Sequence, residues 1–259
     1  MTQTASFRAH AHPTAIVLLH GVGGAARIWT PQLASFAAAG YRPVALDLPG
    51  YGARPPVDAM DFESLAGDVE AAIDQLGLRR PMLLGHSLGG MIAQTVLRRR
   101  PQHYAAAVLS GTSPIFGSRD GSFQKKFLED RLGPLDRGGR MRELAPRLVD
   151  EIMGPRPDPE GRALAVELMS AVAEQTYRAS MQCLTTFDER ANLGHIAVPV
   201  LCLAGEHDRN APPATMQRMA EKIPGSRYIC LGDVGHLPNL EAPRAFNAAV
   251  LGFLAGVTA

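Results

Sequence analysis

A serine placed between two glycines is the feature of this sequence with the clearest chemical potential. The motif GHSLG occupies positions 85–89, directly after the apolar run 82–84 and before the helix-like stretch 91–100. A G-x-S-x-G motif between a strand and a helix is typical of a nucleophile elbow, in which the glycines permit a sharp bend and the serine hydroxyl is exposed. The pattern makes Ser87 a candidate nucleophile, although an ordinary glycine-rich turn has the same spacing.

A nucleophilic serine needs a base within hydrogen-bond reach and a carboxylate that orients this base. Among the eight histidines we favour His236, because it follows the last strand-like run and so lies at the carboxyl edge expected of a parallel sheet, where such folds bind ligands. Asp208 follows another strand-like run, 198–203, at the same edge. The order Ser87, Asp208, His236 is the one expected for an elbow-type triad. Glu206 is the alternative acid.

A glycine-rich loop, HGVGGAA at 20–26, follows the first strand-like run and has two interpretations. Taken as G-x-G-x-x-A, with Asp47 near the end of the next strand, it is close to a dinucleotide-binding fingerprint. A phosphate would then miss the helix N-terminus, because the helix start marked by Pro31 comes several residues after the glycines. Alternatively, the loop supplies an oxyanion donor, the backbone N–H of Val22, and Asp47 belongs to a structural turn. We favour the second interpretation.

Strand-length apolar runs alternate with helical stretches through most of the chain, which predicts an α/β fold with a mostly parallel, doubly wound sheet covered on both faces. The expected strands are 15–19, 43–46, 82–84, 107–109, 198–203 and 227–231, and the expected helices are 31–39, 61–76, 91–100, 212–223 and 242–254. Between 114 and 195 the pattern is helical only, with pieces at 123–132, 140–153, 160–175 and 177–187. Pro146 is expected to kink or restart the second piece. The sequence thus predicts a core, residues 1–113 and 196–259, with an inserted helical lid, 114–195.

Composition argues against several functional classes. The chain has 259 residues, of which 46% are hydrophobic, and its net charge of +1 offers no field for nucleic acid or a membrane surface. The basic cluster 98–100 closes a predicted helix, where cations complement the helix dipole. Residues 1–13 lack the apolar segment of a signal peptide, so we expect a cytoplasmic protein. The three cysteines include no C-x-x-C pair, so we expect no disulfide framework and no metal site.

Five motifs in order resemble those of the α/β-hydrolases over essentially the whole chain. They are His20-Gly21, DLPGYG at 47–52, GHSLGG at 85–90, GEHD at 205–208 and Gly235-His236. The resemblance implies the α/β-hydrolase fold, with Ser87 as nucleophile, His236 as general base and then acid, and Asp208 as the residue that orients it. It also implies an oxyanion hole formed by the backbone N–H groups of Val22 and Leu88.

The lid exit and the segment after His236 are similar to those of 3-oxoadipate enol-lactonases. This finer resemblance implies a serine hydrolase that cleaves a small ester or lactone through an acyl-enzyme and without a cofactor. Carbon–carbon hydrolases of aromatic ring-fission products are an alternative, although they usually carry Trp after the catalytic histidine, where this chain has Leu237. A non-catalytic ligand-binding protein of the same fold is a third possibility, and a homo-oligomer is left open.

The substrate pocket is the least defined part of the site. Apolar candidates to line it are Trp29, Met153, Met169 and Phe187. Candidates to receive a substrate carboxylate are Arg131, Arg147, Arg162 and Arg178, which the sequence does not rank. A helical lid must bury apolar side chains against the core in any case, so packing competes with substrate contact at every apolar candidate.

Overall fold

Six strands form one parallel sheet in the computed structural model, which describes residues 14–257. Their order is β2-β1-β3-β4-β5-β6. The strands are β1 (Ala15–Leu19), β2 (Arg42–Leu46), β3 (Met82–His86), β4 (Ala107–Ser110), β5 (Val200–Gly205) and β6 (Arg227–Leu231). The predicted doubly wound α/β fold is confirmed. The segment 1–13, for which the sequence predicts no signal peptide, lies outside the described residues.

Burial explains why the strands appear in the sequence as continuous apolar runs. Every residue of β1, β3, β4 and β5 is buried, whereas the edge strands β2 and β6 are partly exposed. A parallel strand covered on both faces needs apolar side chains at successive positions. The register pairs Leu19 with Gly85 and His86 with Ser110, so β1, β3 and β4 end close together. The residue that follows β3, Ser87, therefore emerges at the carboxyl edge of the sheet.

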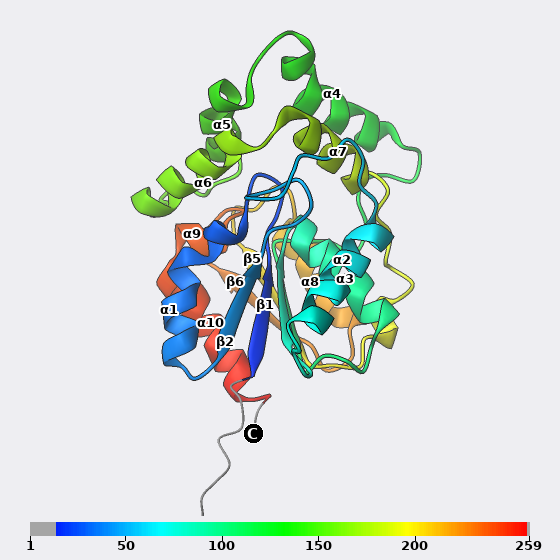
Figure 1. Cartoon of the computed structure of the whole chain (residues 1–259), viewed down its shortest axis with the longest axis vertical. Coiled ribbons are helices and arrows are strands. Elements are labelled where there is room, and N and C mark those ends of the chain that lie inside the picture. The colour runs from blue at the N-terminus through cyan, green and yellow to red at the C-terminus, as the bar shows by residue number, and fades with distance from the viewer. Residues whose placement is uncertain (1–13, 258–259) are drawn as a thin grey trace, which may run out of the picture.

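Helices cover both faces of the sheet (Figure 1). On one side lie α1 (Thr30–Ala38) and α10 (Pro243–Ala255), and on the other lie α2 (Phe62–Gln75), α3 (Leu88–Arg99) and α8 (Pro213–Lys222). Outside the helical segment 114–195, two short elements were not predicted from the sequence, the 3-10 turn η1 (Ala26–Trp29) and the helix α9 (Pro238–Glu241). Across residues 14–257, no helix has both the length and the apolar character needed to cross a membrane.

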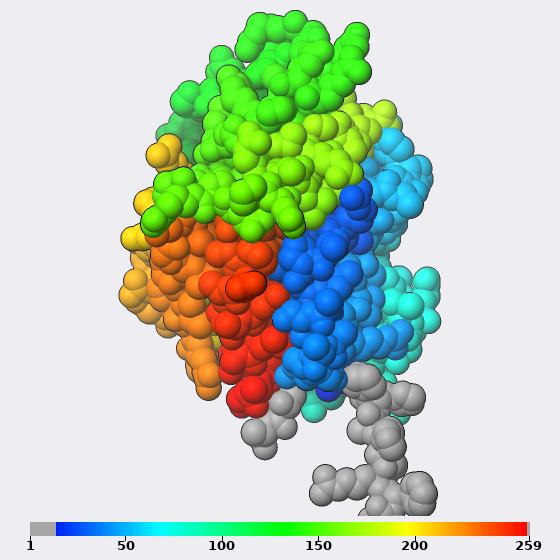
Figure 2. Space-filling model, turned by 90° about the vertical axis from the view of Figure 1, so that its left-hand side faces the viewer, coloured from blue at the N-terminus to red at the C-terminus, as the bar shows by residue number. Residues whose placement is uncertain are grey.

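The chain between β4 and β5 forms a separate block of helices above the carboxyl ends of the strands (Figures 1 and 2). Its helices are α4 (Ser122–Asp136), α5 (Met141–Asp150), α6 (Pro159–Ala171) and α7 (Glu174–Leu184), followed by the 3-10 turn η2 (Leu193–His195). Pro146 was expected to kink or restart the predicted piece 140–153, and it lies inside the single helix α5, so the helix does not restart there. Proline has no backbone N–H, so α5 lacks one hydrogen bond at Pro146. Burial of the apolar side chains of Ala145, Leu148 and Val149 offsets that loss.

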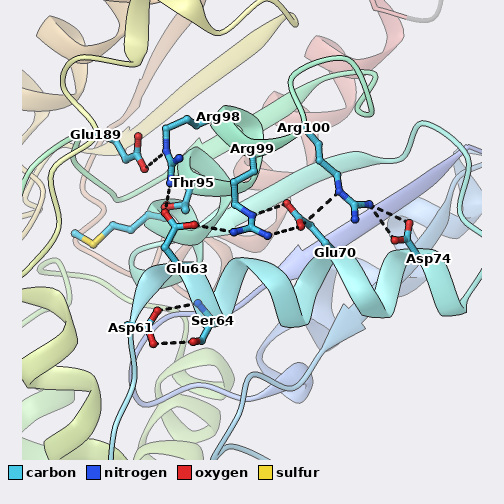
Figure 3. A network of polar contacts seen from close by, with 11 residues as sticks. Asp61, Glu63, Ser64, Glu70, Asp74, Thr95, Arg98, Arg99, Arg100 and Glu189 are labelled. Carbon is cyan, nitrogen blue, oxygen red and sulfur yellow. Dashed lines mark hydrogen bonds and ion pairs between the residues drawn. The ribbon is translucent and has the colours of Figure 1, made fainter.

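An ion-pair network ties α2 to α3, the helix that begins directly after Ser87 (Figure 3). Arg99 Nε lies 2.9 Å from Glu70 Oε1, and Arg100 Nη1 lies 2.9 Å from Asp74 Oδ2. Arg98 Nε lies 2.9 Å from Glu189, which belongs to the chain returning from the helical block. Each guanidinium of the basic cluster 98–100 is therefore paired with a carboxylate. The cluster anchors α3 and presents no uncompensated basic patch.

Candidate active site

Ser87 lies on a bend that the fold holds in an unusual backbone conformation. β3 ends at His86 and α3 begins at Leu88, so the serine is the single residue between strand and helix. Its φ is 53° and its ψ is −117°, a region that residues with a side chain rarely adopt. The Ser87 N–H donates to the Ser110 carbonyl at 3.0 Å, which fixes the bend against β4. Strain of this kind persists only where surrounding contacts enforce it, and it concentrates at functional sites.

The two glycines of the GHSLG motif are required by close backbone approach. A Cβ atom on Gly85 would fall on the carbonyl oxygen of Gly89, and one on Gly89 would fall on the carbonyl oxygen of Leu19. Both obstacles are backbone atoms, which cannot move aside as a flexible side chain can. The first turn of α3 can therefore pack against β1 and β3 only with glycine at both positions, and this packing sets the direction of the Ser87 side chain.

The three side chains predicted as a triad form one hydrogen-bonded line. His236 Nε2 lies 3.0 Å from Ser87 Oγ, and His236 Nδ1 lies 2.8 Å from Asp208 Oδ2. The three residues follow β3, β5 and β6, so all of them extend from one edge of the sheet. With the proton on Nδ1 donated to the carboxylate, Nε2 is free to accept the proton of the serine hydroxyl.

Asp208 is buried but stays ionised. Burial raises the pKa of Asp208, whereas His236 and the backbone N–H groups of two neighbouring residues lower it. The lowering effects outweigh burial, so the pKa of Asp208 lies below its usual value. The N–H groups of Asn210 and Ala211 donate to its Oδ1 at 2.8 and 2.9 Å. The alternative acid, Glu206, is exposed and accepts the N–H of Asp233 at 2.9 Å. The carboxylate aligned with His236 is therefore that of Asp208.

The loop after β1 brings backbone N–H groups close to Ser87. A Cβ atom on Gly21 would lie 2.9 Å from Ser87 Cβ, and the next residue, Val22, lines the same cavity as Ser87 and His236. Within residues 14–257, neither the Val22 N–H nor the Leu88 N–H donates a hydrogen bond. Leu88 opens α3, and the first N–H groups of a helix have no acceptor within it. Two unengaged donors beside a serine are what an oxyanion hole requires.

His20 and Asp47 stabilise this loop through hydrogen bonds. The Leu48 N–H donates to His20 Nε2 at 3.1 Å, while His20 Nδ1 faces the Gly21 carbonyl at 2.8 Å. Burial lowers the pKa of His20 to about 4, so at neutral pH the ring is neutral and carries its proton on Nδ1. Asp47 Oδ1 accepts the Ala26 N–H at 2.7 Å. Its carboxylate thus closes the glycine-rich loop, a role within the protein that agrees with the structural-turn interpretation.

Glu241 is a part of the site that the sequence analysis missed. Its buried carboxylate accepts the N–H groups of Gly235 and Leu237, each at 2.8 Å, and that of Gly154 at 2.6 Å. The first two donors flank His236, and the third belongs to the connection between α5 and α6. Glu241 therefore holds the backbone of the histidine loop and joins it to the helical block. The available signal was a lone acid two residues before Pro243, the proline that opens the last helix, since a carboxylate that becomes buried there needs partners.

A cavity of about 140 Å³ lies next to Ser87 and His236. Most of its lining is apolar, and the helical block contributes half of the lining residues, including Leu148, Ile152 and Met169. Of the apolar residues that the sequence offered for the pocket, Met169 is thus correctly placed. A mostly apolar cavity with a few polar groups at one point is the usual form of a small-molecule site.

Three predicted pocket residues do not line this cavity. Trp29 is fully buried against Phe246, with ring centroids 6.3 Å apart, and Phe187 is buried against Phe62 at 4.6 Å. Met153 follows a residue of the lining but does not itself reach the cavity. Phe187 joins the helical block to the core, whereas Trp29 packs within the core. A sequence does not distinguish such packing of a large apolar side chain from substrate contact.

Most of the arginines predicted to bind a substrate carboxylate also lie outside the cavity lining. Of the four arginines proposed, Arg131 lines the cavity, and its Nη1 lies 3.3 Å from Glu151. The others are ion-paired outside it: Arg147 with Glu151, Arg162 with Asp150, and Arg178 with Asp136 and Glu174. A further arginine, Arg209, lines the cavity and was not anticipated. Arg209 directly follows Asp208 in the chain, but only the folded loop shows that its side chain lines the cavity.

Comparison with known families agrees with the fold. The profile of the alpha/beta hydrolase family matches residues 16–249. The chain belongs to the alpha/beta hydrolase family. This result confirms the α/β-hydrolase fold and the prediction that the protein is a hydrolase. The match begins in β1 and ends in α10, so it includes Ser87, Asp208 and His236.

Several relatives cover nearly the whole of this α/β-hydrolase. It is 30% identical over 254 residues to the putative non-heme bromoperoxidase BpoC of Mycobacterium tuberculosis H37Rv, an alignment that spans 94% of this chain and 95% of the relative. It is 29% identical to the putative carbamate hydrolase RutD of Variovorax paradoxus, over 95% of this chain and 93% of that protein. Among solved structures, the enol-lactonase from Burkholderia xenovorans LB400 superposes with a TM-score of 0.85 at 27% identity, over 95% of this chain and 93% of that one.

Proposed function

We propose that this α/β-hydrolase cleaves small esters or lactones through an acyl-enzyme on Ser87. The observation that carries the proposal is the hydrogen-bonded line from Ser87 Oγ through His236 to Asp208, which lies beside a cavity of small-molecule size. The likeness to a solved enol-lactonase supports the substrate class. The scissile bond is therefore an acyl–oxygen bond, and the substrate is a small molecule.

Acylation follows from the positions of the donors and acceptors. Ser87 Oγ attacks the substrate carbonyl carbon while His236 Nε2 takes the hydroxyl proton. The carbonyl oxygen becomes an oxyanion and accepts hydrogen bonds from the N–H groups of Val22 and Leu88. The Asp208 carboxylate stabilises the imidazolium that forms. One oxyanion donor lowers the barrier by about 2.7 to 4 kcal/mol in comparable sites.

Deacylation uses the same groups in the reverse order. The tetrahedral intermediate collapses, and His236 returns its proton to the leaving oxygen, which departs as an alcohol or, for a lactone, stays attached to the acyl chain. Water then gives a proton to His236 and attacks the acyl carbon, and Ser87 leaves with that proton. The net reaction adds one water across the acyl–oxygen bond and releases the free acid.

We further propose that the helical segment 114–195, which contains α4 to α7, acts as the lid of this site. The Ile152 carbonyl accepts the His236 N–H at 2.7 Å, so the lid contacts the backbone of the proposed base directly. Apolar lid residues then keep bulk water away from the acyl group, which strengthens electrostatic interactions at the reacting centre.

The test is steady-state hydrolysis of p-nitrophenyl acetate and butyrate by the intact chain. We expect Ser87→Ala to lower kcat by at least about 10³-fold with an unchanged fold, because the nucleophile is lost. Ser170→Ala is the matched control, since this hydroxyl donates to the Val166 carbonyl within α6 and lies outside the cavity lining. Equal turnover by wild type and Ser87→Ala would refute the mechanism.

Two further substrates separate the alternatives. Turnover of an enol-lactone supports the proposed substrate class, whereas turnover confined to aromatic ring-fission products would replace it with carbon–carbon hydrolysis. Absence of turnover on every substrate, combined with saturable binding of an ester, would instead favour a ligand-binding protein. The wild-type protein and the Ser87→Ala variant are used in each assay.

A further inference from the structure

The active-site cavity adjoins a second depression at one side. Four residues line both spaces, namely Ser113, Phe116, Phe123 and Asn210. The second space, which we call the α8 groove, lies between the segment 113–117 and helix α8 and is open to solvent. Phe123 is 53% exposed, an unusual degree for a large aromatic side chain in this chain. A substrate that extends beyond the apolar cavity on this side therefore meets the four shared residues and, beyond them, the groove.

The α8 groove is positively charged. Arg190, Arg218 and Lys222 contribute to its lining, and the described lining includes no aspartate or glutamate. Arg209 adds a fourth cation from the lining of the adjoining cavity. The net charge of the whole chain is only +1, so this concentration of cations is local.

Three of these cations lack a compensating carboxylate. Arg190 is paired with Asp188 at 2.7 Å. Among residues 14–257, by contrast, Arg209, Arg218 and Lys222 form no ion pair, and the recorded side-chain contact of Arg218 is with a threonine hydroxyl of α8 at 3.2 Å. Cations without a carboxylate partner around one groove attract an anion. Because the groove is open to solvent, a bound anion keeps part of its hydration shell and pays little desolvation energy.

The direction of the groove indicates which part of a substrate enters it. The leaving oxygen of an ester takes its proton from His236 Nε2, so the alcohol arm lies on the side of the Asp208–His236 pair. Arg209 and Asn210 directly follow Asp208 in the chain and line the cavity, and Asn210 also lines the groove. The acyl arm is then left to the apolar lining of the lid.

We propose that the α8 groove binds an anionic group, a carboxylate or a phosphate, on the alcohol arm of the substrate. The inference rests on the proposed ester hydrolysis and narrows its substrate class to esters with an apolar acyl chain and an acidic alcohol. Arg209, Arg218 and Lys222 recognise the anion, and Phe116 and Phe123 form the wall between the two compartments. Because the groove is open, this recognition is electrostatic and salt-sensitive.

The experiment compares three butyryl esters of similar size, those of ethylene glycol, glycolate and 2-hydroxyethyl phosphate. We expect kcat/KM to be higher for the two anionic esters than for the neutral one, and the difference to shrink as salt is raised from 0.02 to 0.5 M. Arg209→Gln, Arg218→Gln and Lys222→Gln should each reduce the ratio of anionic to neutral kcat/KM by about fivefold, the size expected for one partly exposed charge pair. The glycolate and phosphate arms show which anion the groove prefers.

The control is Arg244→Gln, which removes an exposed arginine of α10, a helix on the other face of the sheet (Figure 1). This variant should leave the ratio unchanged. A ratio that is equal to one in wild type, or that Arg209→Gln, Arg218→Gln and Lys222→Gln do not lower, would overturn the inference while leaving the proposed hydrolysis intact.

A binding measurement covers the case in which no ester is turned over. The three esters are titrated calorimetrically into Ser87→Ala, whose groove is unchanged. Tighter binding of either anionic ester, weakened by Arg218→Gln, supports the groove even if the proposed hydrolysis fails. Equal affinity for all three esters would refute it independently of catalysis.

Discussion

The carboxylate of Glu241 accepts the N–H of Gly235 at 2.8 Å, one residue before the proposed base His236. A second bond, from the Leu237 N–H at 2.8 Å, holds the residue on the other side. The histidine is therefore fixed through its backbone on both flanks by one buried side chain, and through its ring by Asp208. Gly154 adds the contact to the lid.

Glu241→Gln should weaken both the fold and the reaction. An amide presents one oxygen and one NH₂ group, so at least one of the three backbone donors would face another donor, and we expect a loss of about 2 kcal/mol in the free energy of unfolding. The kcat for p-nitrophenyl butyrate should fall as well, because the ring of His236 is less well held. Urea unfolding and steady-state kinetics measure the two effects.

Glu221→Gln is the control for this change, since Glu221 is an exposed acid on α8. It should alter neither quantity. A Glu241→Gln protein with wild-type stability and wild-type kcat would show that the buried carboxylate does not position the histidine loop.

Gly89→Ala should destabilise the protein, and Gly67→Ala should not. The added methyl group at 89 overlaps the Leu19 carbonyl oxygen, so the first turn of α3 must move away from β1, at a cost of about 1 to 3 kcal/mol or more. At Gly67, within α2, the nearest atom to the new methyl is 4.0 Å away, and alanine in a helix is favoured over glycine by roughly 0.5 to 1 kcal/mol. Thermal unfolding of both variants should give shifts of opposite sign, and a stabilised Gly89→Ala protein would contradict the close packing.

Stability should decrease in mild acid because two buried histidines are held neutral. Burial lowers the pKa of His20 to about 4, and burial together with the charge of His236 lowers that of His86 to about 3. The unfolded chain takes up these protons near pH 6.5, before the folded protein does, so their contribution is complete above that pH and is lost as pH falls towards 4 and 3. Each histidine contributes a slope of roughly 1.4 kcal/mol per pH unit in that window.

Urea unfolding at several pH values between 7 and 4.5 measures this slope. His20→Gln should reduce the slope of the free energy of unfolding against pH by the contribution of one histidine. Substitution of the exposed His103 by Gln should leave the slope unchanged. A free energy of unfolding that is constant across this range would contradict the neutral, buried state of both rings.

The strands were largely predictable because burial on both faces leaves a simple pattern. The runs 15–19 and 227–231 coincide with β1 and β6. The start of α3 was predicted at Met91, three residues late, because Gly89 and Gly90 are poor helix formers in isolation and are helical here through tight packing against neighbouring segments. Local propensity does not contain that tertiary contact.

In the site, too, some residues could be predicted from sequence patterns and others could not. That Ser87, Asp208 and His236 lie together could be predicted because each follows a strand-like run, and parallel strands bring their carboxyl ends together. Glu241 and Arg209 were not found, because the first acts on backbone N–H groups and the second lines a cavity formed by distant segments. The pocket prediction failed at Trp29 for the converse reason, since its apolar character fits packing and substrate contact equally well.

The most direct test of the account is covalent labelling of the protein with a fluorophosphonate, which reacts with a serine hydroxyl only when that hydroxyl is activated. Peptide mass spectrometry should place the label on Ser87 alone, and His236→Gln and Asp208→Asn should slow labelling by roughly 10³-fold or more while the proteins remain folded. A label on another residue, or labelling of the His236→Gln variant at the wild-type rate, would contradict the proposal that Ser87 is a nucleophile activated by His236 and Asp208.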